Sequence, residues 1–205
     1  MTQLPGLSAV TRLLRARRPV QVASHCDETP AFSLRAYRES DVPTLSALIA
    51  RDAGSLFRWL PIPEGCRTSD DIARDWVRRA SEGDRTNGAW RRLAVGETGQ
   101  ILGGVNLIRI ERGLDWQADV NWWVASTVRG RGVGTELVRR CLDHAFADLP
   151  RGLGLHRVHA GIQHDNPASA RVADKAGFVP DEALDSRLLV GGQWQKHRGY
   201  VATAA

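Results

Sequence analysis

The sequence predicts a single α+β domain built on a mixed sheet, and two observations support this fold class. First, an apolar run at residues 120–124 leads through a glycine-rich link at 129–135 into a segment with apolar residues at three- and four-residue steps, which predicts strand, loop and helix in succession. Second, the periodic segments after residue 32 follow the order strand, two helices, three strands, helix, strand, helix, two strands. This order predicts helices packed on a sheet around one core.

Each element is expected from its local pattern. Strands are expected where apolar residues alternate or run together between turn residues, and a Gly-Gly turn joins the last two. Two helices are expected where capping residues precede an apolar period, at Ser40 or Asp41 and at Ser69, and a third helix reaches Leu149. The last helix is expected at 166–176, with proline in its first turn and glycine at its end. The expected strands are residues 33–38, 90–95, 101–110, 118–124, 156–162, 184–190 and 193–201.

Length and composition predict one domain with an extension. The chain has 205 residues, 42% of them hydrophobic, which suffices for one packed core over residues 32–205. Residues 1–31 are expected to form a basic, partly ordered extension that packs on the domain or on the second subunit of a homodimer. They carry leucines and arginines with no acidic residue before Asp27, a pattern that also resembles an organellar transit peptide. No apolar stretch approaches a bilayer-spanning length, so no membrane partner is expected.

Charge and cysteine usage restrict the partners and the compartment. The formal net charge is +5, but it is spread along the chain without a helix-turn-helix, RRM or zinc-finger signature, so nucleic acid is not an expected partner. A basic entrance for an anionic cofactor or an acidic partner is the milder interpretation. Three widely spaced cysteines predict neither a disulfide framework nor a zinc site, and they favour a cytoplasmic location. His156 and His159 would face opposite sides of one strand, so no metal is expected.

The glycine-rich link is the first candidate for chemistry. Gly130, Gly132 and Gly134 stand at alternate positions directly before a helix, where they allow the backbone N–H groups and the helix dipole to bind a phosphate. A Walker A loop would require a lysine, which is missing here, and a dinucleotide fingerprint would require glycine where Leu137 stands. A plain strand-to-helix turn would also use glycine, and the loop taken alone leaves both interpretations open.

Two motifs together resemble one superfamily. Arg-x-x-Gly-x-Gly at residues 129–134 resembles the acetyl-CoA pyrophosphate loop of the GNAT superfamily of N-acetyltransferases. Residues 165–178 resemble its Asn-x-x-Ser…Gly-Phe segment, most closely that of the RimL/RimJ-type group that acetylates ribosomal-protein N-termini at serine or alanine. The resemblance extends from about Phe32 to Val201, and it implies a GNAT-like, mostly antiparallel sheet flanked by helices.

The resemblance also implies site residues. The strand before the loop would part from its neighbour and pair with the pantetheine arm, although one of its two tryptophans is expected to be core, since alternate residues face opposite sides. Ser169 would protonate the departing thiolate, or else is a first-turn helix serine without chemistry. Asn166 would bind the cofactor arm, cap its helix, or do both. A bulky residue at Gly132 or Gly134 should damage cofactor binding. The implied cofactor-binding residues are Trp122, Trp123, Val124, Arg129, Gly130, Arg131, Gly132, Gly134, Thr135, Asn166 and Ser169.

The general base is the residue that the resemblance does not supply. Rim-type enzymes carry a glutamate in a strand after the Gly-Phe pair, and this place falls near Leu188, which accepts no proton. Asp119, at the start of the glycine-loop strand, is the first substitute, followed by Asp185 and His164. Each of them is also readily explained as a solvated surface group. A base acting through water, or no base, remains an alternative.

The predicted activity is acetyl transfer from acetyl-CoA to a primary amine, directly and without a metal or a covalent enzyme intermediate. The resemblance favours the N-terminal amine of a peptide or protein as the acceptor. A small amine or an antibiotic is the enzymatic alternative. A non-catalytic acyl-CoA-binding regulatory module is a third interpretation, because the expected carboxylate is missing at Leu188.

Overall fold

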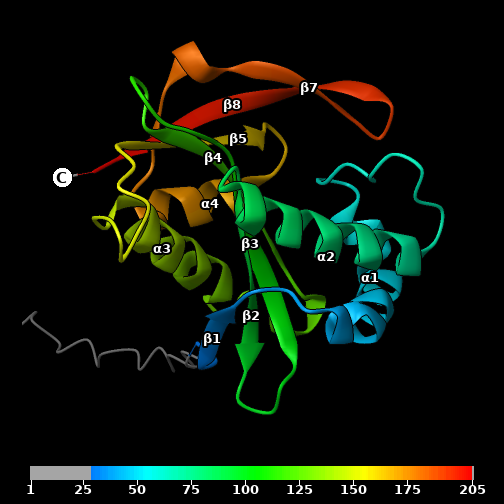
Figure 1. The fold of residues 1–205 in the computed structure, drawn as a ribbon. Helices are drawn as coiled ribbons and strands as arrows, with labels where there is room; N and C mark the ends of the chain where they lie inside the picture. Colours follow the sequence, from blue (N-terminus) through cyan, green and yellow to red (C-terminus); the bar gives the residue numbers. More distant parts are fainter. Residues whose placement is uncertain (1–28, 205) are drawn as a thin grey trace, which may run out of the picture.

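The computed structural model describes residues 29–204, which form an eight-stranded sheet with four α-helices (Figure 1). The helices are α1 (Val42–Leu56), α2 (Ser69–Thr86), α3 (Val133–Phe146) and α4 (Pro167–Ala176). The strands are β1 (Phe32–Arg35), β2 (Trp90–Gly96), β3 (Ile101–Glu111), β4 (Gln117–Val124), β5 (Arg157–Gln163), β6 (Val179–Pro180), β7 (Ser186–Val190) and β8 (Gln193–Thr203). None of the helices between residues 29 and 204 combines the length and hydrophobicity that a membrane crossing requires.

The sheet is mixed and mostly antiparallel, which confirms the predicted fold class. Its strands follow the order β1-β2-β3-β4-β5-β8-β6, and β7 pairs with β8 as a hairpin. The only parallel pair among the described strands is β4 with β5, joined through α3. A parallel neighbour requires such a crossover connection.

The parallel pair is short, and the two strands then separate (Figure 1). β4 pairs with β5 at only three positions, the last of them Asp119 with His159, whereas it stays paired with β3 as far as Val124. The backbone of residues 120–124 therefore has a strand partner on one side only. Unpaired backbone groups of this kind require another hydrogen-bonding partner.

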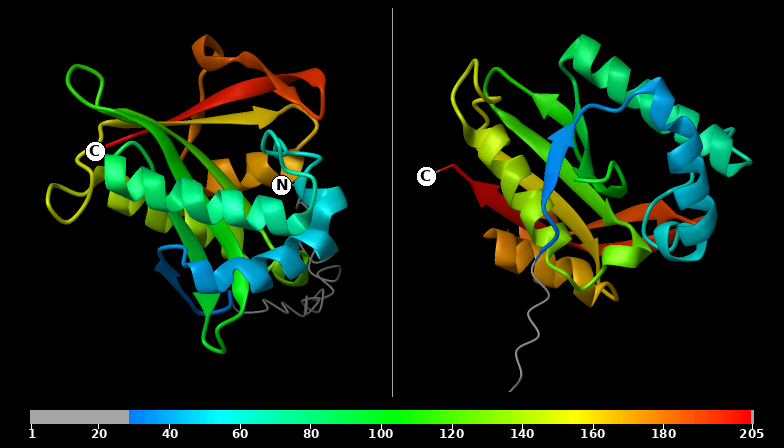
Figure 2. Two further views of the ribbon diagram at one scale, coloured as in Figure 1. Left: turned by 45° about the vertical axis from the view of Figure 1, so that its right-hand side comes forward. Right: turned by 90° about the horizontal axis from the view of Figure 1, so that it is seen from below.

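The helices cover both faces of the sheet (Figure 2). Trp123 of β4 packs against Trp76 of α2, with ring centroids 5.3 Å apart. Trp90 of β2 stacks on His144 of α3 at 4.5 Å. In the sheet register Trp90 is paired with Leu107 of β3, and Leu107 is paired with Val120 of β4, so these side chains lie on one face. Trp123 is three residues after Val120, and an odd step along a strand leads to the other face. The two tryptophans therefore face opposite sides, and α2 and α3 lie on opposite faces of the sheet.

The N-termini of α2, α3 and α4 differ in whether a side chain caps them. The Thr68 side chain caps α2 by accepting from Asp71 N at 3.1 Å, and Asn166 caps α4 by accepting from Ser169 N at 3.1 Å. Gly177 ends α4 in the left-handed region, with φ of 98°, as the sequence predicted. In contrast, α3 begins after Gly132, which has no side chain to offer as a cap. Its first backbone N–H groups are left for another acceptor.

The structure corrects several expected boundaries. The strand expected over residues 33–38 ends at Arg35, because the Asp41 carboxylate binds the Arg35 guanidinium at 2.7 Å and the Arg38 N–H at 2.8 Å and turns the chain there. α3 ends at Phe146, so Leu149 is exposed rather than part of its apolar face. The short strand β6 was not expected. The predicted extension lies almost wholly outside the described residues, so its boundary at residue 31 stays a prediction.

Candidate active site

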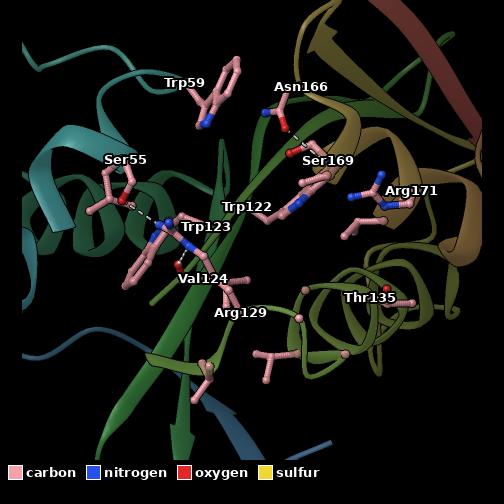
Figure 3. Close-up of a pocket in the computed structure, with 18 of the residues that line it drawn as sticks. Ser55, Trp59, Trp122, Trp123, Val124, Arg129, Thr135, Asn166, Ser169 and Arg171 are labelled. Carbon is pink, nitrogen blue, oxygen red and sulfur yellow. Dashed lines mark hydrogen bonds between the residues drawn. The ribbon is translucent and has the colours of Figure 1, made fainter. Parts of the chain in front are cut away.

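A pocket of about 410 Å³ lies where β4 and β5 separate (Figure 3). One wall comes from α1 and the loop after it, the floor from the end of β4, and the other wall from the glycine loop, α3 and α4. Most of the residues that the sequence predicted for the site are brought together here. The lining consists of Ser55, Leu56, Trp59, Leu60, Trp122, Trp123, Val124, Val128, Arg129, Gly130, Gly132, Val133, Gly134, Thr135, Asn166, Ala168, Ser169, Arg171, Val172 and Lys175.

The glycine loop has the geometry of an anion site. Gly130 and Gly132 have φ of 78° and 81°, a conformation that side-chain-bearing residues rarely adopt. A Cβ on Gly130 would meet no atom within 4 Å, so the loop borders open space there. The uncapped amides at the start of α3 line the same space. Amide donors and the positive end of the α3 dipole together favour a phosphate group.

Gly134 has a different role, which is close packing. A Cβ at this position would lie 3.3 Å from a methyl of Val172 on α4 and 3.4 Å from a methyl of Val124 on β4. The first turn of α3 therefore approaches both elements more closely than a larger side chain would allow. This packing brings the α3 amides to the edge of the split in the sheet.

Basic side chains surround the pocket. The predicted Arg129 contributes, whereas the exposed Arg131 is not among the lining residues. Arg171 and Lys175 of α4 do line the pocket, although neither was expected from the sequence. Their spacing places them on one face of the helix that Asn166 caps, and this is the signal that could have identified them. Every charged side chain in the lining is a cation, which suits a polyanionic ligand.

The two tryptophans of β4 divide as expected. Trp122 lies on the α4 side of the pocket, near Ser169 (Figure 3), whereas Trp123 is 5% exposed and belongs to the core. The Tyr37 phenol lies near the Trp123 indole, and burial raises the pKa of that phenol above its ordinary range. A Cβ on Gly104 would lie 2.6 Å from the Trp123 indole nitrogen and 2.9 Å from the Tyr37 oxygen. This glycine therefore leaves room for the two side chains to lie close together.

Side-chain hydrogen bonds join α1 to the segment after β4. The buried Asp52 carboxylate accepts from the Ser126 backbone N–H at 2.8 Å and from its hydroxyl at 2.6 Å. Burial alone would raise the pKa of Asp52, but hydrogen bonds from Arg51 and Ser126 outweigh it and lower the pKa to about 2. The Arg129 guanidinium donates to the Ser55 hydroxyl at 2.8 Å and to the Val124 carbonyl at 3.3 Å (Figure 3). The α1 wall and the glycine loop are thus held as one unit.

The candidate bases lie elsewhere. Asp119 is at the last position where β4 and β5 pair, forms an ion pair with Arg109, and is not in the lining. Asp185 accepts from the Gly199 N–H at 2.8 Å, and the exposed His164 also lies outside the lining. Leu188, where the resemblance places a carboxylate, is 45% exposed on β7. The pocket lining, as far as residues 29–204 provide it, contains no Asp, Glu or His.

A sheet that opens beside an uncapped helix, with cations around the opening, places the protein among the acyltransferases with a split mixed sheet. The chain matches the Acetyltransferase (GNAT) domain over residues 32–179, and it belongs to this family of N-acetyltransferases. The match covers both the glycine loop and α4.

Individual relatives agree with this family. The chain is 33% identical over 99 residues to the Bacillus subtilis protein named Probable N-acetyltransferase YjcK, which is 48% of this chain and about half, 52%, of that relative's length. It is 25% identical over 171 residues to Bacillus subtilis YdaF, a protein provisionally named a ribosomal N-acetyltransferase, covering 82% of this chain and 88% of YdaF. Mycobacterium smegmatis RimJ, solved in complex with CoA-disulfide, shares the fold with a TM-score of 0.75 at 23% identity, over 86% of this chain and 83% of RimJ.

Proposed function

We propose that this N-acetyltransferase uses acetyl-CoA and transfers the acetyl group directly to the N-terminal amine of a peptide or protein. The observation that carries the proposal is the unpaired edge of β4 beside the uncapped start of α3. The pantetheine arm of acetyl-CoA is extended and carries amides, which can pair with the unpaired edge of β4. The pyrophosphate of acetyl-CoA can accept hydrogen bonds from the uncapped N–H groups of α3. The ribosomal naming of YdaF and the RimJ fold support the acceptor class. A cytoplasmic location and a homodimer remain predictions.

The pocket residues would divide the work by position. Acetyl-CoA, when bound, supplies an acetyl group activated as a thioester. The glycine loop and the α3 amides would hold the pyrophosphate, while Arg171 and Lys175 would neutralise further phosphate charge. The Val120–Val124 backbone would align the arm so that the thioester lies between Trp122 and Ser169. The Ser169 hydroxyl would donate its proton to the sulfur as the carbon–sulfur bond breaks. It would recover a proton, through water, from the acceptor nitrogen, which becomes positively charged when it bonds to the acetyl carbon.

The acceptor must lose its proton without an acidic or histidine side chain from the described lining. We therefore expect kcat/KM to rise with pH as the acceptor amine loses its proton. The midpoint of the rise should lie at the pKa of the acceptor, which is about 7.7 to 8.0 for an N-terminal amine and above 10 for a lysine-like amine. Measuring profiles for one peptide and one alkyl monoamine tests this. Identical profiles for both acceptors would instead show that a group on the enzyme titrates.

The absence of a carboxylate from the described lining also favours a second candidate, a module that binds acyl-CoA without turnover. The two candidates are separated by calorimetric titration with acetyl-CoA, followed by a free-thiol release assay over peptide N-termini and small amines. Amine-dependent thiol release supports the transferase and identifies its acceptor class. Binding without release from any amine supports the regulatory module.

A matched pair of glycine variants tests the site itself. Gly130 and Gly113 have φ of 78° and 87°, and a Cβ on either would meet no atom within 4 Å. Only Gly130 lines the pocket. Gly130→Trp should therefore abolish acetyl-CoA binding, whereas Gly113→Trp should bind like the unmodified protein. Equal affinities in the two variants would exclude the loop as the pyrophosphate site.

A further inference from the structure

A second pocket of about 360 Å³ adjoins the candidate active site. It lies between the loop that follows α1 and the β7–β8 hairpin, two segments on the same side of the molecule in Figures 1 and 2. Leu60 lines both pockets, Trp59 lines the first, and Pro61 lines the second. Three consecutive residues therefore form the boundary between them. The full lining of the second pocket is Phe57, Leu60, Pro61, Ile62, Leu189, Gly191 and Gly192.

The second pocket differs from the first in charge. Its lining, within the described part of the chain, contains no ionisable side chain, whereas the first pocket has three cations. Ile62 and Leu189 are 55% and 54% exposed, and Trp194, which is opposite Leu189 in the hairpin, is 67% exposed. Residues paired across two strands present their side chains on the same face. Trp194 therefore extends the apolar wall that Leu189 begins.

We propose that the second pocket binds an apolar side chain that the acceptor carries next to its reactive amine. The inference rests on the proposed function, because the amine must enter the first pocket to be acetylated, and Leu60, which lines both pockets, joins the second pocket to the first. When an apolar group covers exposed apolar walls, the removal of both surfaces from water lowers the free energy of the complex. A second ammonium group would lose its hydration there without a counter-charge from the lining. The acceptor class is therefore an amine with an apolar neighbour, and polyamines and aminoglycosides are excluded from it.

Short peptides test the preference directly. Two series of tetrapeptides would carry Leu, Phe, Lys or Glu either at the first or at the second position, with alanine elsewhere. In one series, kcat/KM for the Leu and Phe peptides should exceed that for the Lys and Glu peptides about tenfold to a hundredfold, the range expected from burial of one such side chain. Equal values across both series would overturn the proposal.

Two leucine variants locate the preference in the pocket. Leu189→Glu places a carboxylate in the wall of the second pocket. The ratio of kcat/KM for the Lys peptide to kcat/KM for the Leu peptide should therefore rise at least about tenfold. Leu114→Glu makes the same change at a fully exposed turn between β3 and β4, away from both pockets, and should leave the ratio unchanged. An unchanged ratio in Leu189→Glu overturns the proposal.

The proposed function is judged separately in the same experiment. Acetyl-CoA titration and thiol release are recorded for each protein before the peptide ratios are compared. If thiol release occurs at the same rate whatever the peptide side chain, the proposed acetyltransferase function stands and the proposed role of the second pocket is rejected. Absence of acetyl-CoA binding rejects the proposed function itself.

Discussion

The candidate active site and the adjoining second pocket, which form a backbone half and a side-chain half, would recognise their ligands by different means. The half around the glycine loop uses backbone: the β4 edge, two left-handed glycines and the uncapped amides of α3. The half between α1 and the β7–β8 hairpin uses side chains, most of them apolar and several of them exposed. Backbone recognition requires glycine at fixed places and therefore leaves a motif in the sequence. Side-chain recognition can be built from many residue combinations, and it leaves no such mark.

The largest expected effect breaks the backbone half. In Gly134→Leu, the new side chain would contact Val172 and Val124 from its first carbon and push the start of α3 away from the split. Acetyl-CoA affinity should fall at least about a hundredfold, because the α3 amides would no longer meet the pyrophosphate. Calorimetry measures the change. Gly54→Leu, at an exposed position with open space around it, is the control and should bind normally.

The next effect tests the connection between the halves. Asp52→Asn removes a buried carboxylate that accepts two hydrogen bonds from Ser126. A carboxyl group with a pKa of about 2 in the folded protein and about 3.9 in the unfolded chain contributes roughly 2 to 3 kcal/mol at neutral pH. Urea unfolding at pH 7 should therefore show a loss of about 2 kcal/mol, together with a raised KM for acetyl-CoA.

The same substitution makes a prediction about pH. Because folding lowers the pKa of Asp52, its contribution is present above the unfolded pKa and is lost as pH falls through the folded pKa. The difference between the two proteins should shrink between about pH 4 and pH 2. Asp143→Asn, at an exposed position on α3, is the matched control and should change stability little at either pH. A constant difference across this range would show that the charge of Asp52 is irrelevant.

A smaller effect concerns the chemistry inside the backbone half, where Ser169 lines the first pocket. Ser169→Ala removes the hydroxyl but keeps the backbone N–H that Asn166 caps, so α4 should remain intact. If the hydroxyl protonates the sulfur, kcat should fall about tenfold with little change in KM. Steady-state thiol release measures both constants, with Ser186→Ala on β7 as the control. Unchanged kcat would assign Ser169 to the helix alone.

The smallest effect concerns α1, at a position that lines neither pocket. Gly54 lies inside α1, and a Cβ added there would meet no atom within 4 Å, so Gly54→Ala should stabilise the protein by about 0.5 to 1 kcal/mol. Acetyl-CoA affinity should not change, because the backbone half is untouched. Thermal unfolding and calorimetry measure the two quantities. A loss of stability in Gly54→Ala would contradict the prediction that this position of α1 has room for a methyl group.

The sequence predicted the positions of the glycine loop and of the two helices beside it for a physical reason. Glycines before a helix and a capped, proline-started helix are local signals, so their positions could be inferred without knowing the fold. Long-range contacts had no such signal. Asp52 and Ser126 are 74 residues apart in the chain, yet they form the tightest link between α1 and the loop. Asp119 was suitable as a base by sequence position, but it lies where β4 and β5 are still paired.

The three-position ladder between β4 and β5 has a thermodynamic consequence. It divides the sheet into two half-sheets, β1–β4 and β5–β8, which share few backbone hydrogen bonds across the opening. A ligand seated there would act as a surrogate strand for both. Because it would bind the folded protein and not the unfolded chain, each tenfold rise in its free concentration above Kd would add about 1.4 kcal/mol of stability. The melting temperature of the protein would then rise and fall with the amount of free ligand around it.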